Sequence, residues 1–205
     1  MEKATLLCDP YNVIITGVGG QGNVMASRVL GNMLSEKGLE ITIGETFGAS
    51  QRGGSVMSHL RISATSTWSP QIPRGCAHMV VALEPIEALR VLMVYGNPKT
   101  KVLCNTRAIQ PVAVICGDSD YPSLEFLKQS IAELTGQAWF IDATDAALKL
   151  GNPIYGNIMM IGALAAIGDL PMAREDFKNV MSKTMASDKT AANLSAYDLG
   201  AQMIH

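Results

Sequence analysis

The stretch Tyr11-Asn-Val-Ile-Ile-Thr16, followed at once by Gly17-Val-Gly-Gly-Gln-Gly22, decides the fold of this chain. A short apolar run that is rich in β-branched residues predicts a strand buried on both faces. The glycines predict a tight turn into a helix at about 23–37, which Gly38 can end in the left-handed conformation. A strand, a glycine turn and a helix in this order are typical of an α/β fold.

Strands and helices alternate along the rest of the chain. The apolar periodicity predicts strands at 40–45, 55–63, 79–83, 101–104, 112–116 and 138–141, and helices at 123–134, 143–150, 155–167 and 173–185, with one more helix beginning at Glu84-Pro85. We interpret the apolar helix at 155–167 as buried against the sheet and a partner subunit. The polar stretch from residue 190 is interpreted as a tail that wraps a neighbour. The sequence thus predicts a single Rossmann-like three-layer α/β domain over residues 1–205, with a mostly parallel (mixed) sheet and a helical C-terminal part.

Composition narrows the class of protein. Of the 205 residues, 48% are apolar and only 17% are charged, which indicates that a partner covers part of the surface. Sixteen basic residues stand against eighteen acidic ones without any basic block, so we expect no nucleic acid and no anionic membrane as a partner. Residues 1–12 lack the layout of a secretory signal, and the apolar run at 154–167 is shorter than the roughly 20 residues that span a bilayer. We expect a cytoplasmic protein.

The four cysteines, Cys8, Cys76, Cys104 and Cys116, stand far apart and form no C-x-x-C pair. Structural zinc and iron–sulfur sites usually need closely spaced thiolates. We therefore expect no metal and no cluster on this chain, and interpret the cysteines as small apolar core residues.

The first glycine turn has the G-x-G-x-x-G spacing at Gly17, Gly19 and Gly22, with Gly20 and Gln21 inside it. Bare backbone in such a turn can approach a phosphate, and the N-terminus of the following helix supplies amide donors. The alternative is a turn that packs tightly and binds nothing. Gln21 either donates to a carbonyl or phosphate oxygen or caps the turn.

A second glycine turn, Gln51-Arg52-Gly53-Gly54, follows the next predicted strand. The guanidinium of Arg52 can bind a carboxylate, a phosphate or a facing subunit in bidentate fashion, or else form an ion pair with Glu45 that fixes the loop. Loops after neighbouring parallel strands open at one edge of a sheet, so we expect both turns to line one crevice. On the strand that follows, we interpret His59 and Arg61 as lying on a solvated or interfacial face.

Several catalytic signatures are absent from the sequence. It has no G-x-S-x-G, no H-E-x-x-H and no phosphate-loop lysine, since Gly22-Asn23 stands where Gly-Lys-Ser/Thr would be. No histidine and carboxylate can be paired by their spacing as an acid–base couple. The chain is thus equipped to bind a ligand and poorly equipped to catalyse a reaction alone.

Three segments together resemble a known family. They are Ile15-Thr-Gly-Val-Gly-Gly-Gln-Gly22, the run from Gly44 through Gln-Arg-Gly-Gly-Ser to Val56, and Ser58-His-Leu-Arg-Ile-Ser63. They resemble the gamma domain of 2-oxoacid:ferredoxin oxidoreductases, and within that family the beta subunits of indolepyruvate ferredoxin oxidoreductases. The later stretches at 156–164 and 192–200 are similar to the same subunits, so the likeness spans most of the chain.

The resemblance implies a subunit of an enzyme that oxidatively decarboxylates arylpyruvates. That enzyme consumes the 2-oxo acid and coenzyme A, releases carbon dioxide and passes two electrons to ferredoxin, in the manner of anaerobic metabolism. Thiamine diphosphate and iron–sulfur clusters are expected on a larger alpha subunit, with no cofactor held by this chain alone and no catalytic residue on it.

The resemblance also implies that two loops border the active site and handle coenzyme A or the oxo acid. Carried over by position, the first loop is Gly17, Gly19, Gly20, Gln21 and Gly22, and the second is Ser50, Gln51, Arg52, Gly53, Gly54 and Ser55, with Glu45 between them. Phe47 and Ser50 stand where related chains often differ, which leaves the preference for an aryl group open. Two alternatives remain at this point: an NAD-dependent dehydrogenase built on the first loop, and a purely structural assembly subunit.

Overall fold

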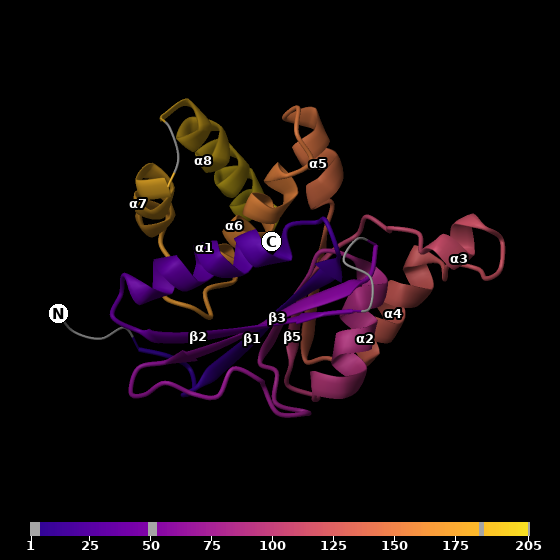
Figure 1. The fold of residues 1–205 in the computed structure, drawn as a ribbon, viewed down its shortest axis with the longest axis horizontal. Helices are drawn as coiled ribbons and strands as arrows, with labels where there is room; N and C mark the ends of the chain where they lie inside the picture. The colour runs from indigo at the N-terminus through magenta and orange to yellow at the C-terminus, as the bar shows by residue number, and fades with distance from the viewer. Residues whose placement is uncertain (1–4, 49–52, 185–186, 205) are drawn as a thin grey trace.

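The computed structural model describes residues 5–48, 53–184 and 187–204. In this described part of the chain, six strands form one mixed sheet in the order β2-β3-β1-β4-β5-β6 (Figure 1). The strands are β1 (Tyr11–Val18), β2 (Glu40–Phe47), β3 (Ser55–Ser63), β4 (Met79–Ala82), β5 (Lys101–Asn105) and β6 (Gln137–Ile141). The expected α/β fold with a mixed sheet is confirmed.

Strand β1 lies at the centre of the sheet and is buried along its whole length. It pairs in parallel with β4, and β4, β5 and β6 continue in the same direction. On its other side β1 pairs antiparallel with β3, and β3 pairs antiparallel with β2. The first two strands along the chain are therefore not neighbours, because β3 returns between them as the second arm of a hairpin.

Helices cover both faces of the sheet (Figure 1). On one face lie α1 (Asn23–Ser35), α6 (Tyr155–Ile167), α7 (Arg174–Thr184) and α8 (Ser187–Gln202), with α5 (Ala143–Lys149) beside α6. On the other face lie α2 (Pro85–Tyr95) and α4 (Leu124–Glu133). The short helix α3 (Val112–Ile115) projects away from the body.

The core has two layers because successive side chains of a strand point to opposite faces. Val13 and Ile15 of β1 belong to the layer under α1 and α6. Ile14, between them, belongs to the layer under α2 and α4. This alternation explains why the sequence of β1 is apolar without interruption.

The C-terminal stretch, expected as a tail that wraps a neighbour, is instead the helix α8, which packs on α6 of the same chain. The two backbones approach so closely that a Cβ on Gly162 would overlap the carbonyl of Tyr197, and one on Gly200 would overlap that of Met159. Glycine and alanine make much of this contact. The stretch therefore carries few large apolar residues, and its sequence is that of a polar segment.

The expected exposure of His59 and Arg61 is also wrong, because both are buried. Residues 64–78 cross this face of β3: Ile72 donates its N–H to Nδ1 of His59, and Trp68 lies under the guanidinium of Arg61. Burial lowers the pKa of His59, so the ring stays neutral near pH 7.

Two further expectations fail. The strand expected at 112–116 is wrong, because residues 112–115 form α3 and Cys116 caps its C-terminus. Of the cysteines, only Cys104 is a core residue; Cys8 is half-buried, and Cys76 and Cys116 are exposed. No helix in the described part of the chain is long and apolar enough to cross a membrane.

Candidate functional site

The candidate site lies at the carboxyl ends of β1, β4 and β5. The helix that follows β1, α1, turns to one face of the sheet, and the helix that follows β4, α2, turns to the other. Loops that diverge in this way leave a crevice between them, and ligands of open α/β sheets bind in such crevices. A cavity of about 340 Å³ occupies this position.

Gln21 fixes the shape of the first loop. Its Oε1 accepts a hydrogen bond from the N–H of Val18 at 2.7 Å, and its Nε2 donates to the carbonyl of Leu83 at 2.9 Å. Leu83 follows β4, so the side chain ties the turn after β1 to the end of the neighbouring strand. Both polar groups of the Gln21 amide are therefore engaged within the protein.

The N-terminus of α1 is open to an acceptor. Its capping residue is Gly22, at φ 88°, with no side-chain cap and no acidic residue in the first turn. By contrast, α2, α4 and α5 are capped by the side chains of Glu84, Ser123 and Asp142. Within the described residues, the N–H groups of Gly20 and Gly22 have no hydrogen-bond partner. Free amides at the positive end of a helix favour an anion.

The two glycine loops lie side by side. Gly19 donates its N–H to the carbonyl of Gly54 at 2.8 Å, and Gly53 donates to the carbonyl of Gly19 at 3.3 Å. Gly48 donates to Ser55 and closes the base of the hairpin. The loops meet because β3, which follows the second loop, pairs with β1. The expected reason, that β1 and β2 are neighbouring parallel strands, is wrong.

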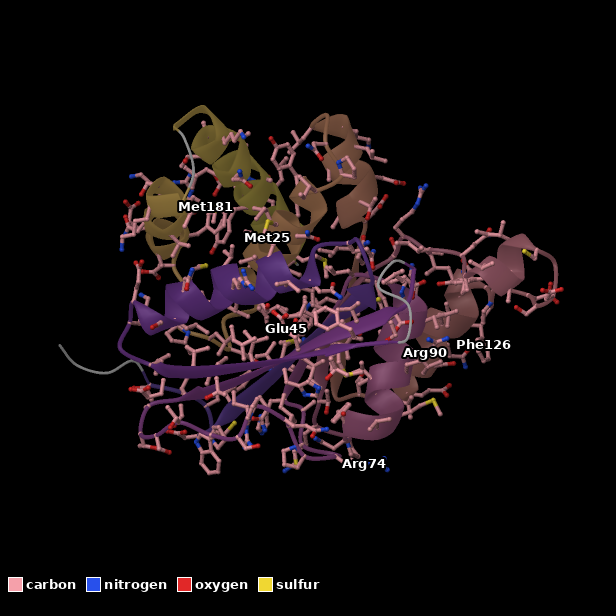
Figure 2. The ribbon with its side chains drawn as sticks, viewed as in Figure 1. Met25, Glu45, Arg74, Arg90, Phe126 and Met181 are labelled. Carbon is pink, nitrogen blue, oxygen red and sulfur yellow. The ribbon has the colours of Figure 1, made fainter. Side chains whose placement is uncertain are left out.

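Some of the expected site residues cannot be placed at this crevice. Ser50, Gln51 and Arg52 lie outside the described residues. Glu45 is exposed on β2 (Figure 2), and its side chain makes no hydrogen bond or ion pair with another described residue. Phe47 is exposed and lines a second cavity of about 220 Å³ beside Gly19, Gly20 and Gly22.

The cavity of about 340 Å³ adds residues that the sequence did not single out as site residues. Its apolar lining includes Leu83 and Met160, and its polar lining includes Asn105, Arg107 and Asn157. Arg107 is exposed and donates to Asp145 at 3.1 Å. Asn157, on the first turn of α6, is buried against Gly22, and its Nδ2 has no partner in the described part of the chain. No sequence motif marks Asn105 or Arg107, which come from β5 and the segment after it, and the family resemblance at 156–164 did not single out Asn157 as a site residue.

Two buried carboxylates were also missed from the sequence. Glu84 and Glu87 begin α2 and line a smaller cavity of about 140 Å³ with Gly53 and Gly54. Ser55 donates its hydroxyl to Glu87 at 2.5 Å, and Arg90 donates to the same carboxylate at 3.1 Å. Burial raises the pKa of Glu87, with Glu84 adding to the effect and Ser55 and Arg90 opposing it. The sequence pattern predicts that a helix begins at Glu84. It does not predict that the hairpin of β2 and β3 covers this carboxylate.

The described residues contain no group of three or more histidine, cysteine, aspartate or glutamate side chains that could hold a metal ion. Among the described residues, the crevice offers backbone donors, the guanidinium of Arg107 in its ion pair with Asp145, and apolar walls. It is suited to binding a ligand with an anionic part and an apolar part.

Comparison with known proteins assigns this fold to a family. The family model for pyruvate ferredoxin/flavodoxin oxidoreductase matches residues 12–203, and the chain belongs to this family. It is 37% identical to indolepyruvate oxidoreductase subunit IorB of Pyrococcus horikoshii over 191 residues, which cover 93% of this chain and 94% of that protein. The resemblance found in the sequence is thereby confirmed.

Two solved structures share the fold. Pyruvate oxidoreductase subunit PORC of Thermotoga maritima is similar with a TM-score of 0.71 and 20% identity, over 95% of this chain and 97% of that chain. A 2-oxoglutarate:ferredoxin oxidoreductase from Magnetococcus marinus, solved with 2-oxoglutarate, coenzyme A and succinyl-CoA bound, has a TM-score of 0.73 and 18% identity. That match covers 96% of this chain and 31% of the Magnetococcus chain.

Proposed function

We propose that this chain is the accessory subunit of an indolepyruvate-type 2-oxoacid:ferredoxin oxidoreductase. The enzyme decarboxylates an arylpyruvate oxidatively, joins the acyl group to coenzyme A and passes two electrons to ferredoxin. The observation that carries the proposal is the 37% identity to subunit IorB of Pyrococcus horikoshii over nearly the full length of both chains. It is supported by the family match over residues 12–203.

The reactive groups belong, in this proposal, to a larger subunit. The cysteines described here do not fit an iron–sulfur cluster, because Cys104 is buried alone in the core while Cys76 and Cys116 are exposed on separate segments. The thiamine diphosphate of the larger subunit supplies the carbanion stabilisation that decarboxylation requires. The present chain contributes binding and positioning.

The two glycine loops are proposed to handle coenzyme A or the oxo acid. The free N–H groups of Gly20 and Gly22, at the positive end of α1, fit a phosphate or carboxylate oxygen. The guanidinium of Arg107 adds a positive charge at the same cavity. The second loop, from Ser50 to Ser55, is proposed to complete the site.

Reconstitution tests the proposed function. The chain and its larger partner are purified separately and together, and the reduction of ferredoxin is followed with indolepyruvate and coenzyme A. We expect activity from the complex and none from this chain alone. The proposal would be refuted by full oxidoreductase activity of the isolated chain, or by a complex that reduces no ferredoxin with any 2-oxo acid.

The contribution of Arg107 is tested in the same complex with Arg107→Ala. Loss of one charge-assisted contact costs about 1.5–3 kcal/mol, so the apparent KM for coenzyme A or the oxo acid should rise by roughly ten- to a hundredfold. Lys178→Ala, a variant of an exposed ion-paired residue on α7, serves as the matched control. If both variants give the wild-type KM for each substrate, Arg107 is not part of the site.

A further inference from the structure

Residues 109–121, which we call the arm, project from the body of the molecule between β5 and α4 (Figure 1). The arm carries α3, and none of the residues of this helix is buried. Val112 is 74% exposed and Ile115 is 70% exposed. The sequence Pro111-Val-Ala-Val-Ile-Cys116 is as apolar as a core strand, yet within the described chain it stands in solvent.

The arm is held at both ends by one carboxylate. Glu84 is only 1% exposed, and its Oε1 accepts hydrogen bonds from the N–H of Ile109 and from the hydroxyl of Tyr121. Its Oε2 accepts from the N–H of Glu87 and caps α2. A buried carboxylate that joins both ends of the segment to the sheet fixes the base of the arm while its apolar tip stays uncovered.

The tip has the composition of an interface. Exposed apolar area costs about 25 cal/mol per Å² relative to burial, and contiguous exposed apolar side chains mark protein contacts. Phe126, on the first turn of α4, is also 58% exposed, and it lies at the same end of the molecule as α3 (Figures 1 and 2). Asp118 and Asp120 are exposed next to α3 and add a polar border.

The place of the arm indicates what covers it. Pro111 and Val112 line the smaller cavity together with Gly53, Gly54 and Ser55, so the arm borders the second glycine loop. It therefore lies at the edge of the sheet where, under the proposed function, the larger subunit must bring its reactive centre.

We infer that the arm is a docking element for the larger, catalytic subunit of the oxidoreductase. Its apolar tip, Val112 and Ile115, inserts into an apolar surface of that subunit. Glu84 holds the arm at the angle that this contact needs. The inference rests on the proposed function, because that function supplies the partner.

The test measures assembly with the larger subunit for the double variant Val112→Asp/Ile115→Asp. Both side chains are exposed, so the urea midpoint of the isolated chain should stay at the wild-type value. The dissociation constant for the larger subunit should rise by roughly tenfold or more. Leu7→Asp is the matched control: Leu7 is 71% exposed but precedes β1, at the opposite end of the sheet from the arm.

A second variant, Tyr121→Phe, tests the role of Glu84 without changing the tip. Loss of the hydroxyl frees one end of the arm, so hydrogen exchange at residues 109–121 should become faster and assembly weaker, with the rest of the chain unchanged. Unchanged exchange together with unchanged assembly would show that Glu84 does not position the arm.

The outcomes separate the two proposals. If wild-type chain and larger subunit form an active complex and the double variant binds as tightly as Leu7→Asp, the inference is refuted while the proposed function stands. If the wild-type chain does not bind the larger subunit at all, the proposed function fails and the inference fails with it. If the isolated chain forms a dimer that the double variant dissociates, the arm contacts a second copy and the named occupant is wrong.

Discussion

The substitution Gly22→Ala tests how the first loop is held against α6. Gly22 has φ 88°, where an alanine costs about 1–2 kcal/mol. A Cβ at this position would also overlap Nδ2 of Asn157, which is buried. Forcing extra volume into a packed site costs a further 1–3 kcal/mol or so. We therefore expect Gly22→Ala to lower the free energy of unfolding by about 2–5 kcal/mol.

Gly20→Ala is the matched control. Gly20 also has a positive φ, 104°, but a Cβ there would meet nothing within 4 Å. Its cost should be limited to the backbone term, about 1–2 kcal/mol. The difference between the two variants then isolates the contact with Asn157.

Urea unfolding followed by far-ultraviolet circular dichroism gives both free energies. The double variant Gly22→Ala/Asn157→Ala removes the overlap. Its free energy of unfolding should therefore lie below that of Asn157→Ala by only as much as Gly20→Ala lowers the wild-type value. If Gly22→Ala costs no more than Gly20→Ala, the close packing of the first loop on α6 is refuted.

Three further predictions concern the second loop and the C-terminal helix. Ser55→Ala should destabilise the fold by about 1.5–3 kcal/mol, because it removes a hydrogen bond to a buried carboxylate. Arg90→Ala should cost about 1 kcal/mol or less, since Arg90 is mostly exposed. Equal losses of the free energy of unfolding in urea would contradict this order. Because the pKa of Glu87 is raised, the folded chain binds this proton more tightly than the unfolded chain does. The free energy of unfolding therefore falls as the pH rises above 4.5, the ordinary pKa of this carboxyl. The stability of Glu87→Gln relative to wild type should accordingly increase from pH 4 to pH 7, and a constant difference would show that burial does not control this group. Gly200→Ala should lower the thermal midpoint, because the added Cβ would overlap the carbonyl of Met159 on α6. Helix propensity alone predicts a higher midpoint for this variant, and that result would contradict the packing of α8 on α6.

The local patterns of the sequence predict most of the elements. The boundaries of β3 and α6 follow from the alternation of apolar residues at 55–63 and from an apolar stretch of helical length, whereas β1 runs beyond the expected Thr16 to Val18. Asp142 caps α5 as its position before the apolar segment indicates. These features depend on neighbours in the chain, so sequence reasoning reaches them.

The errors share one physical cause, which is contact between distant segments. The apolar run at 112–116 has the composition of a strand, but Glu84 anchors the two ends of the arm, at Ile109 and Tyr121, and the run between them forms α3 away from the sheet. His59 and Arg61 are buried because residues 64–78 cross β3. The apolar periodicity does not predict the helix α8, because its contact with α6 depends on small residues rather than on large apolar ones.

The sequence by itself determined the strand, glycine turn and helix that begin the sheet, the family and the two loops of the candidate site. Only the tertiary structure decided that β3 lies between β1 and β2, that the loops are joined by hydrogen bonds through Gly19, and that Asn157, Glu84 and Glu87 stand beside them. The reason is that periodicity and turn residues report the local conformation of the chain. Strand order and the burial of polar side chains depend on which distant segments share an edge or a face, and no local pattern encodes that.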